Sequence, residues 1–247
     1  MNITVVTGAA SGIGAATVDR LRTDGHAVLG IDVADSPLDA DADRVAWIKG
    51  DVGSPETWSQ AVQTTRSKFG GTPSGLVLSA ARHVVGTILD TTPQQWNDVF
   101  ETNVVGAYHG IRACLPGMRE MGFGAIVTVA SVDAFMAEQA FAAYCASKGA
   151  LLQLTRAVAL DYARDGIRAN CVCPGVTDTP FFRHHLHSAE DPDSWLAARV
   201  ARQPMGRLLD PTDVSNLIAF LLSDQASAMT GAMAVVDAGL SVGFDFR

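Results

Sequence analysis

The chain has 247 residues and a formal net charge of −8 at pH 7, which argues against nucleic acid or an anionic membrane surface as its partner. Hydrophobic residues make up 48% of the chain, enough for a sizeable core, yet no apolar run approaches the roughly 20 residues of a membrane span. Because no basic segment followed by an apolar stretch begins the sequence, we expect a cytoplasmic protein.

Short apolar runs alternate with longer helical patterns along the whole chain. The runs lack the polar alternation of half-exposed strands, which is typical of parallel strands covered on both faces. They are Ile3–Thr7, Ala27–Asp32, Val45–Lys49, Leu76–Ser79, Ala125–Ala130, Ile167–Cys173 and Met233–Asp237. Helix starts are indicated where a cap residue precedes a proline, at Ser54-Pro55, Thr92-Pro93 and Asp210-Pro211. We predict a single doubly wound α/β domain over residues 1–247, with a seven-stranded parallel sheet flanked by helices.

A glycine-rich turn follows the first run, at Gly8-Ala9-Ala10-Ser11-Gly12-Ile13-Gly14, and opens a helix that should extend to about Asp24. The glycines permit a tight turn and let backbone N–H groups approach a pyrophosphate, whose charge the helix amino end favours. A turn of this kind directly between a strand and a helix predicts a nucleotide site. The expected contacts are Gly8, Ser11, Gly12, Ile13 and Gly14.

Asp32 ends the second run, where a carboxylate can bind the hydroxyls of the adenosine ribose. A 2′-phosphate there would meet like-charge repulsion, and no Lys or Arg stands at residues 11, 33 and 34 to reverse the sign. NAD is therefore favoured over NADP. Asp51 and Val52 follow the third run, where the carboxylate could reach the adenine edge or could simply be solvated in a loop.

Tyr144 and Lys148 lie four residues apart and so share one face of a predicted helix. An isolated tyrosine has a pKa of about 10, too high for a proton carrier near neutrality, and a neighbouring ammonium would favour the phenolate. Taken alone, the pair also fits an amphipathic helix with a solvated lysine.

In this order and context, Thr7-Gly8-x-x-x-Gly12-x-Gly14 and Tyr144-x-x-x-Lys148 resemble the short-chain dehydrogenase/reductase family. Asn103, Ser131 and Pro174-Gly175 occupy further matching positions. The resemblance extends from Thr7 to Gly239 and implies a Rossmann fold that exchanges a hydride between nicotinamide and a carbonyl or secondary alcohol. One departure is Ser79-Ala80-Ala81, where the family usually has Asn-Ala-Gly; another is Ala238, where glycine is common.

The resemblance also implies a role for each matching residue. Tyr144 would pass the proton to or from the substrate oxygen, and Lys148 would lower the tyrosine pKa and bind the nicotinamide ribose. Ser131 would hold the substrate oxygen, and Asn103 would bind a water that links Lys148 to solvent. The resemblance also implies that the cofactor contacts Asn103, Tyr144 and Lys148, together with the residues after the first three strands named above. Further implied cofactor contacts are Ala80, Pro174, Gly175, Val176 and Thr179.

Residues 179–205 are expected to form a lid over the substrate. Its apolar members are Phe181, Phe182, Trp195 and Met205, and the opposite wall should contain Val132, Asp133, Phe135, Met136 and Phe141. Asp133 could bind a second hydroxyl, as in a diol or sugar-like substrate, or could cap its own turn. His184, His185 and His187 are poorly spaced for one helical face, so we predict no metal site.

We predict an NAD-dependent short-chain alcohol dehydrogenase or carbonyl reductase acting on a small-molecule secondary alcohol or ketone. One alternative is an NADPH-dependent carbonyl reductase of the 3-oxoacyl type, acting on acyl chains of a carrier protein; Asp32 and the net charge of −8 weigh against it. Another is a catalytically idle NAD-sensing regulator, which the intact set of Asn103, Ser131, Tyr144 and Lys148 opposes. The resemblance further implies a homotetramer that pairs helices 103–118 and 144–163 across two-fold axes.

Overall fold

The computed structural model describes residues 2–36, 44–186 and 191–243, and a parallel sheet is its central layer. The strand order is β3-β2-β1-β4-β5-β6-β7, and every neighbouring pair is parallel. The strands are β1 (Ile3–Thr7), β2 (Ala27–Asp32), β3 (Val45–Lys49), β4 (Gly75–Leu78), β5 (Gly124–Val129), β6 (Ile167–Pro174) and β7 (Met233–Val236). The predicted seven-stranded doubly wound fold is confirmed, with strand ends that differ from the prediction by one residue at β4 to β7.

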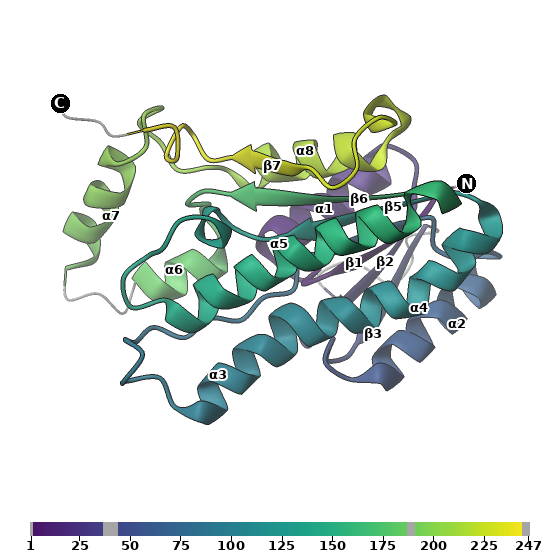
Figure 1. The fold of residues 1–247 in the computed structure, drawn as a ribbon, viewed down its shortest axis with the longest axis horizontal. Helices are drawn as coiled ribbons and strands as arrows, with labels where there is room; N and C mark the ends of the chain where they lie inside the picture. Colours follow the sequence, from purple (N-terminus) through teal and green to yellow (C-terminus); the bar gives the residue numbers. More distant parts are fainter. Residues whose placement is uncertain (1, 37–43, 187–190, 244–247) are drawn as a thin grey trace.

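Helices cover both faces of this sheet. On one face lie α2 (Pro55–Phe69), α4 (Gly106–Met121) and α5 (Ala142–Tyr162), and α4 and α5 cross the near side of the sheet in Figure 1. On the other face α1 (Gly12–Thr23) packs beside α8 (Pro211–Leu222).

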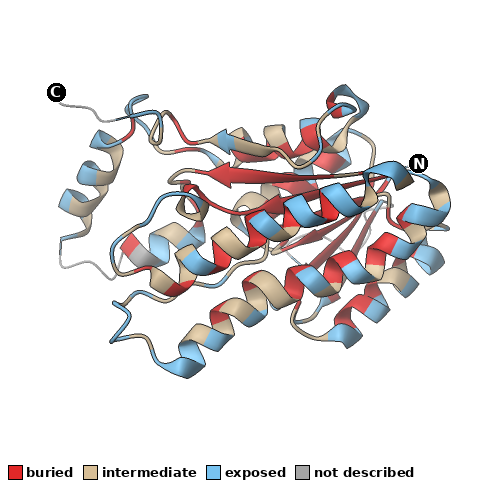
Figure 2. Ribbon diagram, in the orientation of Figure 1, coloured by how far each residue is buried: buried red, intermediate tan, exposed pale blue. Residues whose placement is uncertain are grey.

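Two apolar layers result, because successive strand residues point to opposite faces. Val5 belongs to the layer under α2, α4 and α5, whereas its neighbour Val6 belongs to the layer under α1 and α8, and both are fully buried. In Figure 2 strands β1 to β6 are mostly buried, β7 is partly exposed, and the outer sides of the helices are exposed. The nearly continuous apolar runs of the sequence therefore reflect burial on both sides.

The three Xaa-Pro helix starts occur where the sequence predicts them. Thr92 caps α3 (Pro93–Phe100) and Asp210 caps α8, each in a reciprocal capping box that satisfies first-turn N–H groups. Ser54 precedes α2 but makes no capping hydrogen bond; its hydroxyl donates to the Glu56 carboxylate instead, at 2.6 Å.

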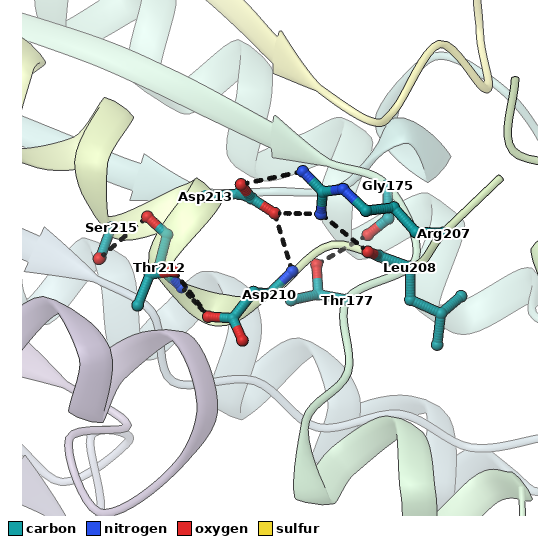
Figure 3. Close-up of polar contacts among 8 residues, drawn as sticks. All are labelled: Gly175, Thr177, Arg207, Leu208, Asp210, Thr212, Asp213 and Ser215. Carbon is teal, nitrogen blue, oxygen red and sulfur yellow. Dashed lines mark hydrogen bonds and ion pairs between the residues drawn. The ribbon is translucent and has the colours of Figure 1, made fainter. Parts of the chain in front are cut away.

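The predicted lid leaves the sheet after β6 and contains α6 (Pro180–Leu186) and α7 (Pro192–Ala201). Its two ends are tied together, because the N–H of Leu209 donates to Val176 O and the N–H of Asp178 donates to Leu209 O, both at 2.9 Å. Figure 3 shows Arg207 reaching back from this junction to Asp213 in the first turn of α8, with an N–O separation of 2.6 Å. The segment predicted to be a lid therefore starts and ends at one hydrogen-bonded junction at the carboxyl edge of the sheet.

Candidate active site

A cavity of about 1040 Å³ lies at the carboxyl edge of the sheet, beneath the lid helices. Every residue predicted to bind cofactor or substrate oxygen lines it, with the exception of Asn103. The lining set is Gly8, Ser11, Gly12, Ile13, Gly14, Asp32, Asp51, Val52, Ala80, Ser131, Tyr144, Lys148, Pro174, Gly175, Val176 and Thr179. The carboxyl ends of parallel strands thus bring together residues that are distant in the sequence.

The glycine turn is built so that the main chain itself forms the cavity wall. Gly8 and Gly12 have φ values of 65° and 54°, which glycine adopts at no steric cost. A Cβ on Gly14 would lie 2.0 Å from the oxygen of Gly8, so only glycine fits there. Ser11 precedes α1 without capping it through its side chain, which leaves first-turn N–H groups for an anion. These features fit a pyrophosphate.

Asp32 and Asp51 are both oriented by main-chain N–H groups. The Asp32 carboxylate accepts hydrogen bonds from Ala10 N and Ala34 N, each at 3.0 Å, and so is fixed at the end of β2. The Asp51 carboxylate accepts from Gly53 N at 2.8 Å. A fixed negative group beside a ribose fits neutral hydroxyls better than a phosphate.

Thr7 organises the segment that departs from the family pattern. Its Oγ1 accepts hydrogen bonds from the N–H groups of Ser79 and Ala80, both at 3.0 Å, so the end of β1 holds the exit of β4. The fit is close, because a Cβ on Gly8 would approach Ala80 Cα to 2.9 Å. The sequence shows that Ser79 replaces the asparagine usual in the family, but it gives no signal that Thr7 binds the main chain of residues 79 and 80.

Tyr144 and Lys148 share one face of α5, as predicted, but the electrostatics differ from the prediction. The Nζ of Lys148 donates to Val129 O at 2.8 Å and lies 5.3 Å from the centre of the Tyr144 ring. Burial lowers the pKa of Lys148 to about 8. Burial, and next the charge of Asp133, raise the pKa of Tyr144 above its ordinary value. Lys148, whose amine points to Val129, is not among the main influences on the pKa of Tyr144, so the expected lowering is not seen.

Ser131 follows β5 and is held by Asp133, two residues further on. The hydroxyl of Ser131 donates to Asp133 Oδ2 at 3.0 Å, while the N–H of Asp133 donates to Ser131 Oγ at 3.1 Å. Burial, and next the charge of Glu138, raise the pKa of Asp133 to about 6. The side chain of Ser131, and not that of Asp133, caps this turn, while the Asp133 carboxylate accepts from Ser131 and lines the cavity.

Asn103 lies in a π-helical turn, Glu101–Val105, that joins α3 to α4. Its Oδ1 accepts from Arg82 N at 2.7 Å, and its Nδ2 donates to Arg82 O and to Ser147 Oγ, both at 2.9 Å. With 1% of its surface exposed, Asn103 ties the loop after β4 to α5. Its side chain is thus occupied by protein groups, and the relay through a bound water stays a prediction.

The expected apolar walls are largely present. Phe181, Phe182 and Trp195 of the lid line the cavity, and so do Val132, Asp133, Met136 and Phe141. Phe135 and Met205 are instead 41% and 63% exposed. His184 is exposed on α6, whereas His187 and the side chain of His185 lie outside the described residues. Within the ranges that the structure describes, no group of three or more His, Cys, Asp or Glu could hold a metal ion.

An ion pair between Glu138 and Arg199 joins the loop before α5 to lid helix α7. The guanidinium carbon of Arg199 also lies 4.4 Å from the centre of the Trp195 ring. Both ion-pair residues line the cavity. Sequence reasoning missed this pair, because nothing in the local pattern signals that two charges so far apart in the chain meet.

A parallel sheet whose glycine turn after β1 lines one cavity together with Tyr144 and the buried Lys148 is the arrangement of a dinucleotide-dependent oxidoreductase. The family model described as enoyl-(acyl carrier protein) reductase matches residues 8–241. The chain belongs to the short-chain dehydrogenase/reductase family. This confirms the family resemblance and the prediction of an enzyme.

Named relatives agree with this assignment along nearly the full length of the chain. A 3-alpha-(or 20-beta)-hydroxysteroid dehydrogenase of Mycobacterium bovis is 33% identical, with 98% of this chain and 90% of the relative covered. A 2-(R)-hydroxypropyl-CoM dehydrogenase of Xanthobacter autotrophicus is 36% identical, with 95% and 96% covered. The ligand-free structure of aldohexose dehydrogenase from Thermoplasma acidophilum superposes with a TM-score of 0.93 at 29% identity, covering 100% of this chain and 96% of that one. Across the described ranges, none of the helices combines the length and apolar character needed to cross a bilayer.

Proposed function

We propose that this enzyme oxidises a small-molecule secondary alcohol to a ketone with NAD as the hydride acceptor, and that Tyr144 exchanges the proton. The observation that carries the proposal is the single cavity that contains the glycine turn, Asp32, Ser131, Tyr144 and Lys148. The names of the two relatives reported above, which are dehydrogenases of hydroxysteroid and hydroxypropyl compounds, support a secondary alcohol as the substrate.

NAD rather than NADP is the proposed cofactor because the negative charge of Asp32 would repel the 2′-phosphate of NADP. Asp32 is fixed by two main-chain N–H groups, so its carboxylate cannot easily turn away from a 2′-phosphate. The next residue in the cavity wall is the neutral and 67% exposed Val33. Bound here, NAD would supply the acceptor for the hydride that leaves the alcohol carbon.

Side chains of the enzyme position the substrate and accept the proton that the alcohol loses. In oxidation the alcohol O–H bond breaks, its proton goes to the Tyr144 phenolate, and the C–H hydrogen leaves as hydride, so that a ketone remains. Lys148 holds positive charge against the tyrosine ring from one helical turn away. The aromatic rings of Phe141 and Phe181 pack near Tyr144, with ring centres 5.9 and 6.1 Å away, and limit access of water.

A second candidate is reduction of an acyl chain on a carrier protein, which the description of the matching family model favours. Such an activity would be expected to use NADPH and a basic docking surface, whereas this chain has Asp32 and a net charge of −8. A catalytically idle NAD-sensing regulator is the other alternative.

The test follows NADH absorbance after the protein is mixed with NAD and a panel of secondary alcohols, with Tyr144→Phe as the matched variant. Turnover that Tyr144→Phe abolishes supports the proposal. Turnover only with NADPH and an acyl-carrier substrate supports the second candidate, and NAD binding without turnover over a broad panel supports the regulator. Retained turnover in Tyr144→Phe would remove the proposed role of the phenol.

We also propose that the enzyme is a homo-oligomer, with a homotetramer as the specific expectation. A groove between α4 and α5 is lined by apolar side chains that include Ile111, Leu115 and Leu154, and Leu160 on α5 is 84% exposed. Pairing these helices between subunits would cover that surface. Light scattering after gel filtration distinguishes monomer, dimer and tetramer.

A further inference from the structure

The Ser131 hydroxyl has one proton, and in this structure that proton is committed to Asp133. Ser131 donates to Asp133 Oδ2 at 3.0 Å and accepts from the N–H of Asp133 at 3.1 Å. A hydroxyl offers one donor and two acceptor positions, so Ser131 has only one acceptor position left. In this state it cannot donate to the oxygen of a ketone or to the developing charge on an alcohol oxygen.

The Ser131 hydroxyl can turn to the reacting oxygen without leaving Asp133 Oδ2 unpaired when Asp133 has another hydrogen-bond donor. A hydroxyl on the carbon next to the reacting carbon is suitably placed to be that donor. The two oxygens of a gauche vicinal diol lie about as far apart as two hydrogen-bonded oxygens, which is the relation between Ser131 Oγ and Asp133 Oδ2. Asp133 lines the same cavity wall as Ser131 and Tyr144, so one molecule can reach all three side chains.

We propose that Asp133 is a specificity-determining residue that accepts a hydrogen bond from the second hydroxyl of a vicinal diol and thereby releases the Ser131 hydroxyl to the reacting oxygen. The substrate class is then a vicinal diol, and the product is an α-hydroxy ketone. This inference rests on the proposed alcohol oxidation and narrows its substrate.

Several charged and titratable groups near Asp133 influence its pKa, but none of them takes the place of the second substrate hydroxyl. Glu138 faces it from the same loop, Lys148, Tyr144 and Cys145 face it from α5, and Arg199 faces it from the lid helix α7. Arg199 is itself paired with Glu138. Below about pH 6 the carboxyl becomes protonated, because burial raises its pKa to that value. The acid form can donate to Ser131 Oγ and release the serine proton without a diol.

The test compares three probes that share one ring: cyclohexanol, the vicinal cyclohexanediol in both its cis and trans forms, and the cyclohexanediol whose hydroxyls lie on opposite ring carbons. At about pH 8 we expect kcat/KM for one vicinal form to exceed the values for the other two probes by about tenfold, the worth of one hydrogen bond. The diol with opposite hydroxyls controls for polarity alone. Equal values for all probes would overturn the inference.

Two variants then separate a specificity role from a structural one. In Asp133→Asn the amide N–H can donate to Ser131 Oγ in place of the acid proton, so kcat/KM for cyclohexanol should rise several-fold at about pH 8. In Asp133→Ala the vicinal diol should lose its advantage. A residue that only stabilised the turn would lower turnover of every probe and would not raise any of them; that pattern contradicts the proposal.

The pH dependence of the diol preference, measured as a ratio of kcat/KM values, tests the proposal without any variant. The preference for the vicinal diol should narrow as the pH falls through about 6 in the natural enzyme and should be flat in Asp133→Asn. Ionisation of Tyr144 affects both alcohols equally and cancels from the ratio. If Tyr144-dependent oxidation occurs without any diol preference, this inference fails while the proposed function stands. If no alcohol is oxidised, the proposed function fails first.

Discussion

The amine of Lys148 lies one helical turn from Tyr144 on α5, with Nζ 5.3 Å from the centre of the phenol ring. This amine donates to Val129 O at 2.8 Å, so its charge faces the phenol ring from a distance rather than through a direct hydrogen bond. Both groups are destabilised as ions by burial, which raises the pKa of Tyr144 and lowers the pKa of Lys148 to about 8. The site therefore holds a neutral phenol near neutrality, ready to donate a proton.

The raised pKa of Tyr144 predicts different pH dependences for the two directions of the reaction. Alcohol oxidation needs the phenolate, so kcat/KM for the alcohol should increase about tenfold per pH unit from about pH 7 upward until the phenol ionises. Ketone reduction needs the phenol and should be constant over the same range. Initial rates at saturating cofactor measure both profiles. An oxidation rate that does not change with pH would show that Tyr144 is not the proton acceptor.

Lys148 should cost stability at neutral pH, since it is 1% exposed and its pKa is lowered to about 8 by burial. Between about pH 8 and the ordinary lysine value near 10.4 the unfolded chain binds more protons than the fold, so this cost shrinks as the pH rises. Lys148→Met should therefore raise the free energy of unfolding by about 1–2 kcal/mol at neutral pH, and by less near pH 10.

The same variant should lose most of its activity, because the positive charge beside the phenol is removed. Urea unfolding at two pH values and NADH assays on the same preparations measure the two effects. Lys148→Arg keeps the charge and serves as the matched control. A Lys148→Met protein that is both less stable at neutral pH and equally active would contradict the electrostatic reading.

We expect Asn103 to act mainly by stabilising the fold. Its side chain makes three hydrogen bonds, two to the main chain of Arg82 and one to Ser147 Oγ, in a site without access to bulk water. Asn103→Ala should lower the free energy of unfolding by about 2–4 kcal/mol, because buried partners are left unsatisfied. Ser147→Ala removes only one of these partners and should cost about 1 kcal/mol. Chemical denaturation measures both; normal stability with reduced turnover in Asn103→Ala would instead favour the water relay.

Periodicity and spacing were enough to predict the sheet, because strands buried on both faces leave continuous apolar runs such as Ala27–Asp32. The glycine turn could be predicted for a related reason: only glycine allows the approach of residue 14 to the oxygen of Gly8. Such signals are local in the chain, so one sequence carries them.

What the sequence did not predict depends on where long side chains point and on contacts between distant segments. Tyr144 and Lys148 could be placed on one face, but not the hydrogen bond that directs the lysine to Val129. The Glu138–Arg199 pair needs the lid folded over the loop before α5, and the π-helical turn at Asn103 needs the loop after β4 beside it. These features arise from tertiary packing, which a periodic pattern does not record.

Asp32 should determine the choice between NAD and NADP. In the double variant Asp32→Ser with Val33→Arg, the negative charge is removed and a cation is placed at an exposed position in the cavity wall. The ratio of kcat/KM for NAD to that for NADP should then fall at least about a hundredfold, as expected when repulsion is exchanged for a charge-assisted hydrogen bond. Asp51→Ser is the matched control and should leave the ratio unchanged. An unchanged ratio in the double variant would show that Asp32 does not face the ribose.

Ala238 carries backbone strain where the family commonly has glycine. Its φ of 53° lies in the left-handed region, where a Cβ costs roughly 1 kcal/mol. The turn has little freedom to relax, because the Asp237 carboxylate accepts from Gly239 N at 2.9 Å and from Ser241 N at 2.7 Å. Ala238→Gly should therefore raise the free energy of unfolding by about 0.5–1 kcal/mol, even though glycine also gains freedom in the unfolded chain.

The sign of the change in unfolding free energy distinguishes backbone strain at Ala238 from the general effect of replacing alanine with glycine. Ala16 lies inside helix α1, and Ala16→Gly should lower the free energy of unfolding by about 1 kcal/mol, because a helix interior disfavours glycine. The same substitution thus has opposite outcomes at two alanines, and thermal unfolding of the two variants beside the natural protein measures both. A destabilised Ala238→Gly would mean that the hydrogen bonds of Asp237 already hold the turn without measurable strain at Ala238.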